Sequence, residues 1–348
     1  MASDGGAAFA AYLAQKRPQI EDFLSRFTPR PEDSTVHAAG DLARYLYEPL
    51  ARFTAGGGKR TRPALCLLGA EAVGVDPICA LSTAAAIEYF QSAALIHDDI
   101  PDKSELRRGN PCLHLSDGLG IAINVGDLAL VSVYAGLLAD TSLDNDTCAR
   151  ILCELTYMEQ RTLEGQALDL GWVRDGRWDV SVDDYLYMAS HKTAYYSAAT
   201  PLACGAICGG GTDEQVEALF AFGLDAGLAF QLQDDLLNLV GDQAEQGKDY
   251  RSDITEGKRT LLAVWALAHL GDADRSELQS LLSKGTSDQT ELARAVELID
   301  QAGAVEHVRL QAHQLVERAK GHLAGVELAD HASEVLESMA DFFVERLG

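Results

Sequence analysis

Two short clusters of aspartate lie in apolar stretches of the chain, more than a hundred residues apart. Their sequences are LIHDDIPD and FQLQDDLLN, and their acidic members are Asp98, Asp99, Asp102, Asp234 and Asp235. Adjacent carboxylates beside Leu, Ile and Phe lose hydration, which is costly unless a cation or a hydrogen-bond donor replaces the water. A divalent metal ion is therefore the simplest partner for both clusters.

If each cluster lies on a helix, its carboxylates share one face. Asp98 and Asp102 are four residues apart and Asp99 and Asp102 are three apart, so all three would project from roughly one side. The second cluster repeats this spacing as a polar stripe on an otherwise apolar helix. Mg²⁺ usually binds through one or two carboxylates together with substrate phosphates. Two facing stripes would therefore hold a diphosphate through a small group of Mg²⁺ ions.

Two basic motifs accompany the aspartates. The segment 56–63, GGGKRTRP, joins a flexible glycine run to a basic cluster and to a proline suited to the first turn of a helix. Its backbone N–H groups, with Lys59 and Arg62, favour an anion. Arg107 and Arg108 are adjacent and carry like charges that repel each other. Binding of a shared polyanion therefore explains this pair better than a contribution to folding stability does. One Asp-Asp pair means little in a chain with 53 acidic residues, but two pairs beside such motifs predict a diphosphate site.

Together these motifs resemble those of the head-to-tail trans-isoprenyl diphosphate synthases, the polyprenyl synthetases, and among them the geranylgeranyl diphosphate synthases. The matching segments run in the family's order from about residue 50 to 265: GGGKRTRP, DDIPD with KSELRRG, GQALD, HKTA, FQLQDD, GKD and EGKRT. The resemblance implies an all-α fold, a single large helical bundle of the isoprenoid synthase type with a central active-site cavity. It also implies one polyprenyl synthetase domain over residues 1–348 and a homodimer.

The resemblance assigns roles to individual residues. The metal ligands would be Asp98, Asp99, Asp102, Asp234 and Asp235, which would hold about three Mg²⁺ ions against the allylic diphosphate. The residues expected to contact that diphosphate are Arg107, Lys192, Thr193, Gln231, Lys248 and Lys258. Those expected to hold isopentenyl diphosphate are Lys59, Arg62 and Arg108, while Gln166 and Asp169 would line the allylic site.

The implied reaction condenses isopentenyl diphosphate with an allylic diphosphate (dimethylallyl, geranyl or farnesyl). Breaking the allylic C–O bond leaves a carbocation and a diphosphate whose charge grows as it departs, and Mg²⁺ with Arg107 and Lys192 would stabilise that charge. No nucleophilic Ser or Cys is required. Water would quench the cation, so the cavity must be apolar and closed.

Two positions depart from the commonest family pattern. Asn238 stands where many members have a third aspartate, which removes a charge but keeps a carbonyl oxygen. Gln91 stands seven residues before Asp98, where many members have a histidine that binds isopentenyl diphosphate. Because Gln can still donate a hydrogen bond, we expect Gln91 to keep that contact.

The depth of the cavity should set the length of the product. Counting back from the first aspartate along its helix, Ala94 and Ala93 stand about one turn away, and Phe90 and Tyr89 about two, which is roughly 12 Å. The small alanines would leave the first turn of the cavity open, so Phe90, Tyr89 or the neighbouring Tyr134 would form the floor of the cavity. The alternative for Phe90 and Tyr89 is that they are ordinary core residues. Synthases that stop at C15 often carry aromatic residues at the alanine positions. We therefore predict the C20 product geranylgeranyl diphosphate, with C25 or longer as the main rival.

Properties of the whole chain agree with a metabolic enzyme. The 348 residues contain no evident linker or repeat, and helical patterns break near residues 74–77, 142–145, 209–211 and 285–288. The segments 172–184 and 241–258 are predicted to be loops, the second an active-site lid. A net charge of -25 argues against nucleic acid and anionic lipid as partners. Seven cysteines without a CxxC motif favour the cytoplasm, and we expect no transmembrane segment because no run of about 18 apolar residues is evident.

Two other classes of protein share some of these features. A class I terpene cyclase also ionises prenyl diphosphates at an aspartate-rich motif, but it needs no second diphosphate site, which Lys59, Arg62 and Arg108 predict here. A catalytically silent subunit that modulates a partner synthase would be expected to have lost an aspartate motif, and both are present. An assay with labelled isopentenyl diphosphate separates the three, because only a synthase forms longer diphosphates.

Overall fold

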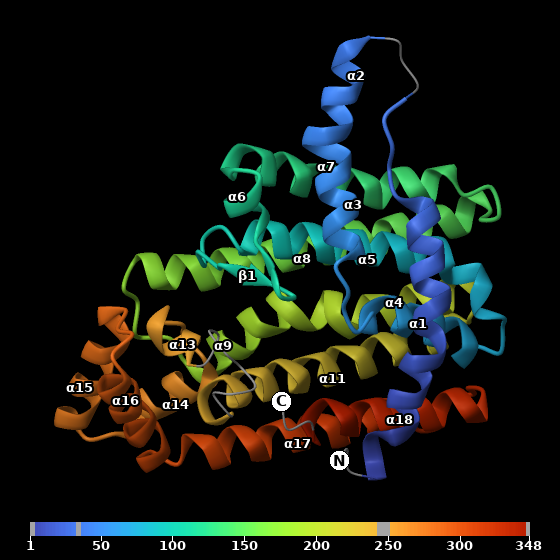
Figure 1. Ribbon diagram of the computed structural model, residues 1–348. Helices are drawn as coiled ribbons and strands as arrows, with labels where there is room; N and C mark the ends of the chain where they lie inside the picture. The colour runs from blue at the N-terminus through green and yellow to red at the C-terminus, as the bar shows by residue number, and fades with distance from the viewer. Residues whose placement is uncertain (1–3, 33–35, 242–250, 346–348) are drawn as a thin grey trace.

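The computed structural model describes residues 4–32, 36–241 and 251–345, which fold almost entirely into helices around a central group of long helices (Figure 1). The helices are η1 (Asp4–Gly6), α1 (Ala7–Phe27), α2 (His37–Leu42), η2 (Ala43–Tyr47), α3 (Glu48–Ala55), α4 (Thr61–Ala72), η3 (Pro77–Ala80), α5 (Leu81–Asp98), α6 (Leu113–Ser116), α7 (Leu119–Ala139), α8 (Asn145–Arg174), α9 (Val182–Ala189), η4 (Ser190–Ala199), α10 (Thr200–Cys208), α11 (Asp213–Val240), α13 (Ser252–Thr255), α14 (Leu261–His269), α15 (Asp272–Lys284), α16 (Gln289–Gln301), α17 (Ala304–His322) and α18 (Asp330–Glu345). The strands β1 (Leu106–Arg107) and β2 (Asn110–Pro111) pair antiparallel. The all-α prediction is confirmed.

The core forms where apolar helices pack closely on several sides. The helix α5 is apolar nearly all round, so it is buried and packs against α4 and α7. The helices α4 and α10 approach through glycines, because a Cβ added at Gly69 would lie 2.1 Å from the Leu202 carbonyl oxygen and one at Gly205 would lie 1.9 Å from that of Cys66. On the other side, α11 packs against η4 and α17. This arrangement fixes α5, α8, η4 and α11 relative to one another.

Three local predictions need correction or completion. The predicted loop 172–184 is shorter in the structure, since α8 extends to Arg174 and α9 begins at Val182. The first aspartate cluster does not stay helical, because α5 ends at Asp98 and the chain then turns. In the predicted lid, the structure describes the short helix α13, whereas Lys248 lies outside the described residues.

Among the described residues, two helical segments are long and apolar enough to cross a membrane, by length and composition alone. They are residues 77–98, with mean hydropathy 1.2, and residues 119–139, with mean hydropathy 1.8. The first is 72% buried inside the molecule, as expected of a core helix, and the second is 39% buried. The second segment, α7, therefore presents an exposed apolar face.

Candidate active site

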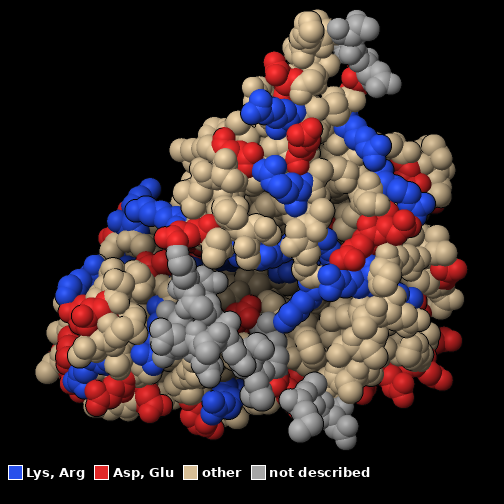
Figure 2. Space-filling view, in the orientation of Figure 1, with Lys and Arg blue, Asp and Glu red and all other residues tan. Residues whose placement is uncertain are grey.

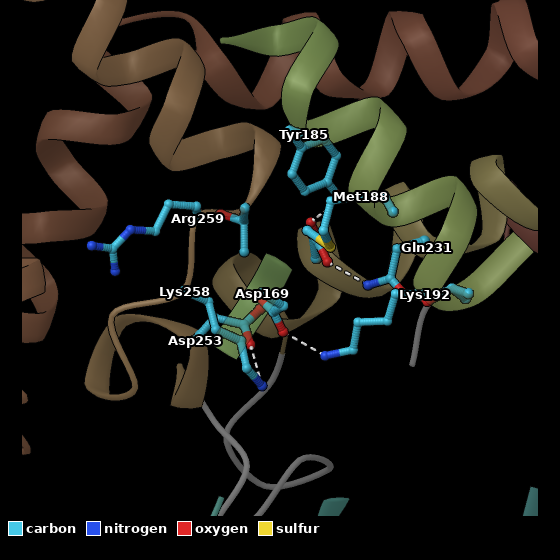
Figure 3. Close-up of a pocket in the computed structure, with 12 residues that line it drawn as sticks. Asp169, Tyr185, Met188, Lys192, Gln231, Asp253, Lys258 and Arg259 are labelled. Atoms are coloured by element: carbon cyan, nitrogen blue, oxygen red, sulfur yellow. Dashed lines mark hydrogen bonds and ion pairs between the residues drawn. The ribbon is translucent and has the colours of Figure 1, made fainter. Parts of the chain in front are cut away.

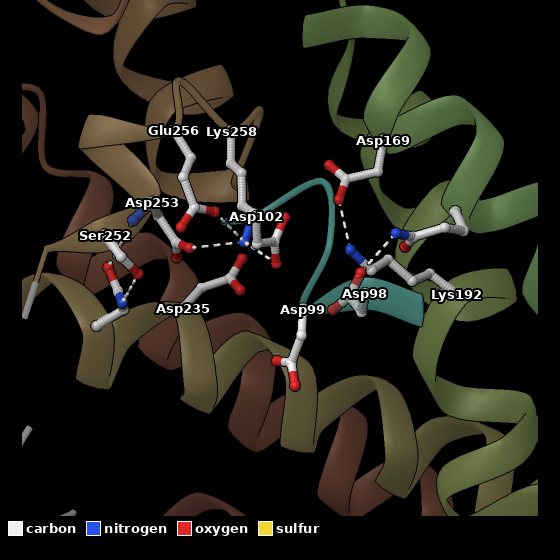
Figure 4. A network of polar contacts seen from close by, with 12 residues as sticks. Asp98, Asp99, Asp102, Asp169, Lys192, Asp235, Ser252, Asp253, Glu256 and Lys258 are labelled. Atoms are coloured by element: carbon white, nitrogen blue, oxygen red, sulfur yellow. Dashed lines mark hydrogen bonds and ion pairs between the residues drawn. The ribbon is translucent and has the colours of Figure 1, made fainter. Parts of the chain in front are cut away.

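The end of α5 and the polar stripe of α11 meet across one pocket, together with residues from α8 and η4. Figure 4 shows the carboxylates of Asp98, Asp102 and Asp235 turned toward the same space, into which Lys192 and Lys258 project. The pocket drawn in Figure 3 is lined by Asp169, Lys192, Thr193, Gln231, Asp235 and Lys258, among others. The structure therefore brings together residues from motifs that are far apart in the sequence.

The three aspartates of the first cluster do not act alike. Asp98 accepts a hydrogen bond from Gln166 Nε2 at 2.6 Å. Asp102 lies 3.9 Å from the Lys258 ammonium group. Asp99 is turned away from both and is buried, and its Oδ1 accepts from Arg107 Nε at 2.9 Å (Figure 4). Asp98 and Asp102 therefore face the pocket, and Asp99 anchors Arg107.

The second cluster is supported by a chain of hydrogen bonds. Asp235 accepts from the Tyr185 hydroxyl at 2.6 Å and from Gln231 Nε2 at 2.7 Å. Gln231 in turn accepts from the Thr193 hydroxyl at 2.7 Å. Asp234, the neighbour of Asp235 on α11, is only half-buried. The chain of bonds fixes the side chain of Asp235, which lies deeper in the protein than Asp234.

In the structure, the side-chain amide of Asn238 is used in two hydrogen bonds and is not positioned as a metal ligand. Its Nδ2 donates to the Ser252 hydroxyl at 3.0 Å, and its Oδ1 accepts from the backbone N–H of Asp253 at 3.2 Å. These bonds tie α11 to α13, which carries Asp253 toward Lys258. The departure from the family pattern thus gives an anchor for α13, which lies within the predicted lid.

Two lysines carry the positive charge of this pocket. Lys192 pairs with Asp169, and Lys258 lies 3.6 Å from Asp253 and 2.6 Å from Glu256. Burial alone would lower the pKa of each lysine, but the surrounding carboxylates outweigh it and raise both pKa values. Both side chains are therefore charged and ready to bind an anion.

The acidic groups fit a divalent cation. Burial, reinforced by neighbouring carboxylates, raises the pKa of Asp102 to about 6, that of Asp253 to about 6 and that of Asp235 to about 8. A bound cation would relieve this repulsion. Within the described ranges, no three His, Cys, Asp or Glu side chains converge on one point as a ligand cluster. Mg²⁺ takes much of its coordination from water and substrate phosphate, so the donor set suits it.

A second, basic site is formed by the glycine-rich segment 56–62 together with Arg108 and residues of η4. Gly58, with φ +135°, lets the backbone pass close to Arg108, since an added Cβ would lie 3.1 Å from the guanidinium carbon. Arg62 donates to the Ser197 hydroxyl at 2.8 Å, and its guanidinium lies over the Tyr196 ring. Lys59 is exposed on the same loop. Lys and Arg side chains also border the hollow in this face of the molecule (Figure 2).

Several polar atoms of this basic site are buried and unpaired. Arg62 Nε, Arg108 Nη1 and Gln91 Oε1 have no hydrogen-bond partner within the part of the chain that the structure describes. Burial and the neighbouring guanidinium groups of Arg60, Arg107 and Arg62 lower the pKa of Arg108, although Glu88 opposes them. An anionic ligand would satisfy the two buried arginine donors and the crowded positive charges, whereas the Gln91 oxygen can only accept a hydrogen bond.

The residues expected to control product length lie along α5 and α7. Ala93 is fully buried and Ala94 half-buried. Phe90 is buried and meets the Tyr196 ring edge-on, with centroids 5.7 Å apart. Tyr134 is half-buried and donates its hydroxyl hydrogen to Glu159 of α8.

The Glu159 carboxyl should make the stability of the fold depend on pH. Burial raises the pKa of Glu159 from 4.5 to about 7. Between these values the folded chain binds more protons than the unfolded chain, so this group's contribution to stability falls as pH rises from 4.5 to 7. We expect Glu159→Gln to gain on the order of 1 kcal/mol relative to the wild type between pH 4.5 and pH 8. Urea unfolding of both proteins across this range measures the difference, and parallel pH curves would contradict the expectation.

Some residues of the site were not assigned from the sequence. Tyr185 holds Asp235, and Asp253 and Glu256 surround Lys258. Arg259, the next residue, also lines the pocket, and its Nε donates to the Arg177 carbonyl oxygen at 2.7 Å. The segments SDI and EGKRT mark three of these residues in the sequence, whereas Tyr185 carries no signal that distinguishes it from a core tyrosine.

Known proteins are similar to this chain in both sequence and fold. The polyprenyl synthetase family profile matches residues 43–299. The short chain isoprenyl diphosphate synthase of Methanothermobacter thermautotrophicus is 37% identical over 329 residues, covering 94% of this chain and 99% of that protein. The geranylfarnesyl diphosphate synthase of Natronomonas pharaonis is 36% identical over 351 residues, covering 96% of each.

A solved structure extends the likeness to the whole fold. The geranylgeranyl pyrophosphate synthase of Corynebacterium glutamicum, complexed with isoprenyl diphosphate and magnesium, superposes with a TM-score of 0.80 at 30% identity, covering 98% of this chain and 97% of that one. The fold is thus the helical bundle of the isoprenyl synthases, and the family uses Mg²⁺ and prenyl diphosphate substrates. The chain belongs to the polyprenyl synthetase family and is a prenyltransferase that condenses isopentenyl diphosphate with allylic diphosphates to form trans-prenyl diphosphates.

Proposed function

We propose that the final product is the C20 compound geranylgeranyl diphosphate. The supporting observation is the order of side chains on α5 before the aspartates, where the small Ala94 and Ala93 stand about one turn away and Phe90 stands about 12 Å down. An enzyme that stops at the C15 product would need bulky side chains at the positions of Ala93 and Ala94. The C25 product is the second candidate, since a relative named as a geranylfarnesyl synthase matches along nearly the whole chain. Product analysis with labelled isopentenyl diphosphate and a farnesyl diphosphate primer decides between them.

The acidic residues that face the pocket would hold the metal ions. In this proposal Asp98, Asp102 and Asp235, together with the neighbouring Asp234, bind about three Mg²⁺ ions, as suits hard oxygen ligands. Asp99, whose carboxylate is occupied by Arg107, contributes by aiming that arginine. When bound, the ions stabilise the negative charge of the departing diphosphate.

The remaining residues of the site divide between the two substrates. The allylic diphosphate is bound by Arg107, Lys192, Thr193, Gln231 and Lys258, and Lys248 keeps the same expected role. The unpaired donors of Arg62 and Arg108, with Lys59 and Gln91, bind isopentenyl diphosphate. Gln166 and Asp169 orient Asp98 and Lys192 through hydrogen bonds. The carbocation forms between these two groups, where apolar walls exclude water.

A homodimer would cover the exposed face of α7. Leu119, Ile123, Val131 and Leu138 are between 44% and 69% exposed, and together they form an apolar patch of the kind that marks an interface. We propose a second copy of this chain as the occupant. Light scattering should then give about twice the chain mass of 37.4 kDa.

We place the enzyme in the cytoplasm, since all seven cysteines are free thiols.

Adding bulk below the metal site should shorten the product. Ala94 is half-buried and lies one turn before Asp98, so Ala94→Phe would fill the upper part of the cavity. We expect the main product to shift toward C15 by about tenfold in product ratio, the scale of discrimination that small changes in an apolar pocket give. Ala94→Ser is the matched control and should keep the wild-type product. Chromatography of the dephosphorylated products reports the outcome, and an unmoved distribution in Ala94→Phe would place the cavity elsewhere.

A further inference from the structure

Arg60 is a basic residue of the glycine-rich segment 56–62 to which the site described above gives no role. Its neighbour Lys59 is exposed and Arg62 is half-buried, whereas the side chain of Arg60 is only 3% exposed. Arg60 also has φ +53°, a left-handed conformation that is uncommon for a residue with a Cβ. A buried guanidinium group on such a backbone persists only where the surrounding structure holds it.

The Arg60 guanidinium group is turned into the protein, where it joins three helices. Its Nη2 donates to the carbonyl oxygen of Thr54, in the last turn of α3, at 2.6 Å, and its Nη1 donates to Oε1 of Glu88 in α5. Its Nε lies 3.9 Å from Oε1 of Glu21 in α1. These contacts hold the segment 56–62 against α3 and α5. Arg60 is therefore an internal anchor of this segment, and its neighbours are left to bind an anion.

Glu88 is a buried carboxylate in a helix that is otherwise nearly apolar. It is 3% exposed, and α5 contains no other acidic residue before Asp98. A carboxylate at this depth is costly unless cations pair with it. Arg60 supplies one cation, and Nη2 of Arg108 lies 3.9 Å from the same oxygen of Glu88. Two guanidinium groups thus share Glu88, one from the segment 56–62 and one from the turn between β1 and β2.

The groups that we assign to isopentenyl diphosphate lie close to this carboxylate. Gln91 follows Glu88 by three residues, so the two side chains project from the same side of α5. At Gly58, an added Cβ would lie 3.1 Å from the guanidinium carbon of Arg108, so the segment that carries Lys59 packs against that arginine. A change in the charge of Glu88 would therefore reach the binding groups through both of its guanidinium partners.

We propose that Glu88 is a positioning residue for isopentenyl diphosphate and acts without touching it. Through Arg60 it holds the segment that carries Lys59 and Arg62, and through its second contact it orients Arg108. The crowded guanidinium groups would repel one another before the substrate arrives, and a buried carboxylate offsets part of that repulsion. This inference rests on the proposed isopentenyl diphosphate site and names the group that holds the site ready.

The main test is Glu88→Gln, which keeps the shape of the side chain and removes its charge. We expect the KM for isopentenyl diphosphate to rise by roughly tenfold or more, because loss of a group that orients a binding residue commonly costs that much. The kcat and the KM for the allylic substrate should stay within about twofold, since Arg107 is held by Asp99. Titration calorimetry with isopentenyl diphosphate alone should show the same loss of affinity.

A double-mutant cycle shows whether Glu88 acts through Arg60. Arg60→Gln alone should also raise the KM for isopentenyl diphosphate, and the double variant should raise it by less than the product of the two single effects. Effects that multiply in full would mean that the two residues act separately, which overturns the inference. The matched control is Glu71→Gln, which breaks the ion pair between Glu71 and Lys16 on α4 and α1. This control should leave both KM values unchanged.

The outcomes separate the role of Glu88 from the site that it supports. Arg108→Gln tests the isopentenyl diphosphate site itself, and a wild-type KM in that variant would overturn the site and the role of Glu88 together. If Arg108→Gln raises this KM and a folded Glu88→Gln does not, the site stands and the role of Glu88 is overturned. If Glu88→Gln does not fold, a crystal structure of the wild-type enzyme with isopentenyl diphosphate decides. Arg60 bound to Glu88 and away from the diphosphate supports the inference, and Arg60 bound to the diphosphate overturns it.

Discussion

Replacing Asp98 by Asn should lower kcat by about a thousandfold, the scale seen when a group that stabilises the charge of a transition state is removed. Asp98 faces the pocket, and its carboxylate accepts a hydrogen bond from Gln166. The substitution keeps the size of the side chain and an acceptor oxygen for Gln166. It removes only the charge that the cation needs, so the fold should be preserved.

The matched control is Asp127→Asn, which makes the same change on α7 at a carboxylate that is 60% exposed. This control should keep wild-type turnover. The measurements are steady-state rates at saturating substrates over a range of Mg²⁺ concentrations, with thermal unfolding to confirm the fold. Asp98→Asn should require more Mg²⁺ for half-maximal rate, because an amide is a weaker ligand than a carboxylate. Wild-type turnover in a folded Asp98→Asn enzyme would show that Asp98 is not a ligand of a metal ion required for the reaction.

The helices and the grouping of the motifs could be predicted because they depend on local patterns. The helix break predicted near residues 142–145 falls between α7 and α8, and the one near residues 209–211 falls between α10 and α11. The polar stripe with Gln231 and Asp235 lies on α11 as its spacing predicted. Such features depend on periodicity and on turn residues, which the sequence displays directly.

The orientation of individual side chains could not be predicted, because it depends on partners distant in sequence. Helical spacing placed Asp99 beside Asp98 and Asp102, yet α5 ends at Asp98, and burial beside Arg107 turns Asp99 away. The bond from Tyr185 to Asp235 joins residues that are 50 positions apart. Neither contact follows from a period or a motif. The sequence therefore predicted which residues gather at the site better than it predicted what each one does there.

Substitution of each of the two adjacent arginines should weaken the binding of a different substrate. Arg108 belongs to the basic site with Arg62, and its buried Nη1 lacks a partner among the described residues. Arg107 is held by Asp99 on the side of the aspartate cluster. We expect Arg108→Gln to raise the KM for isopentenyl diphosphate by about a hundredfold, since a buried charge-assisted contact to phosphate is worth roughly 2–3 kcal/mol. The KM for the allylic substrate should change far less.

Arg107→Gln is the matched partner of this experiment and should show the opposite pattern, with the larger loss on the allylic diphosphate. Steady-state kinetics with each substrate varied in turn measures both ratios. Arg108→Lys should recover only part of the loss, because a lysine supplies the charge without the planar fork of donors. Equal losses on both substrates in Arg108→Gln would mean that the two arginines serve one diphosphate. In that case the enzyme would lack the second anion site that distinguishes a synthase from a cyclase.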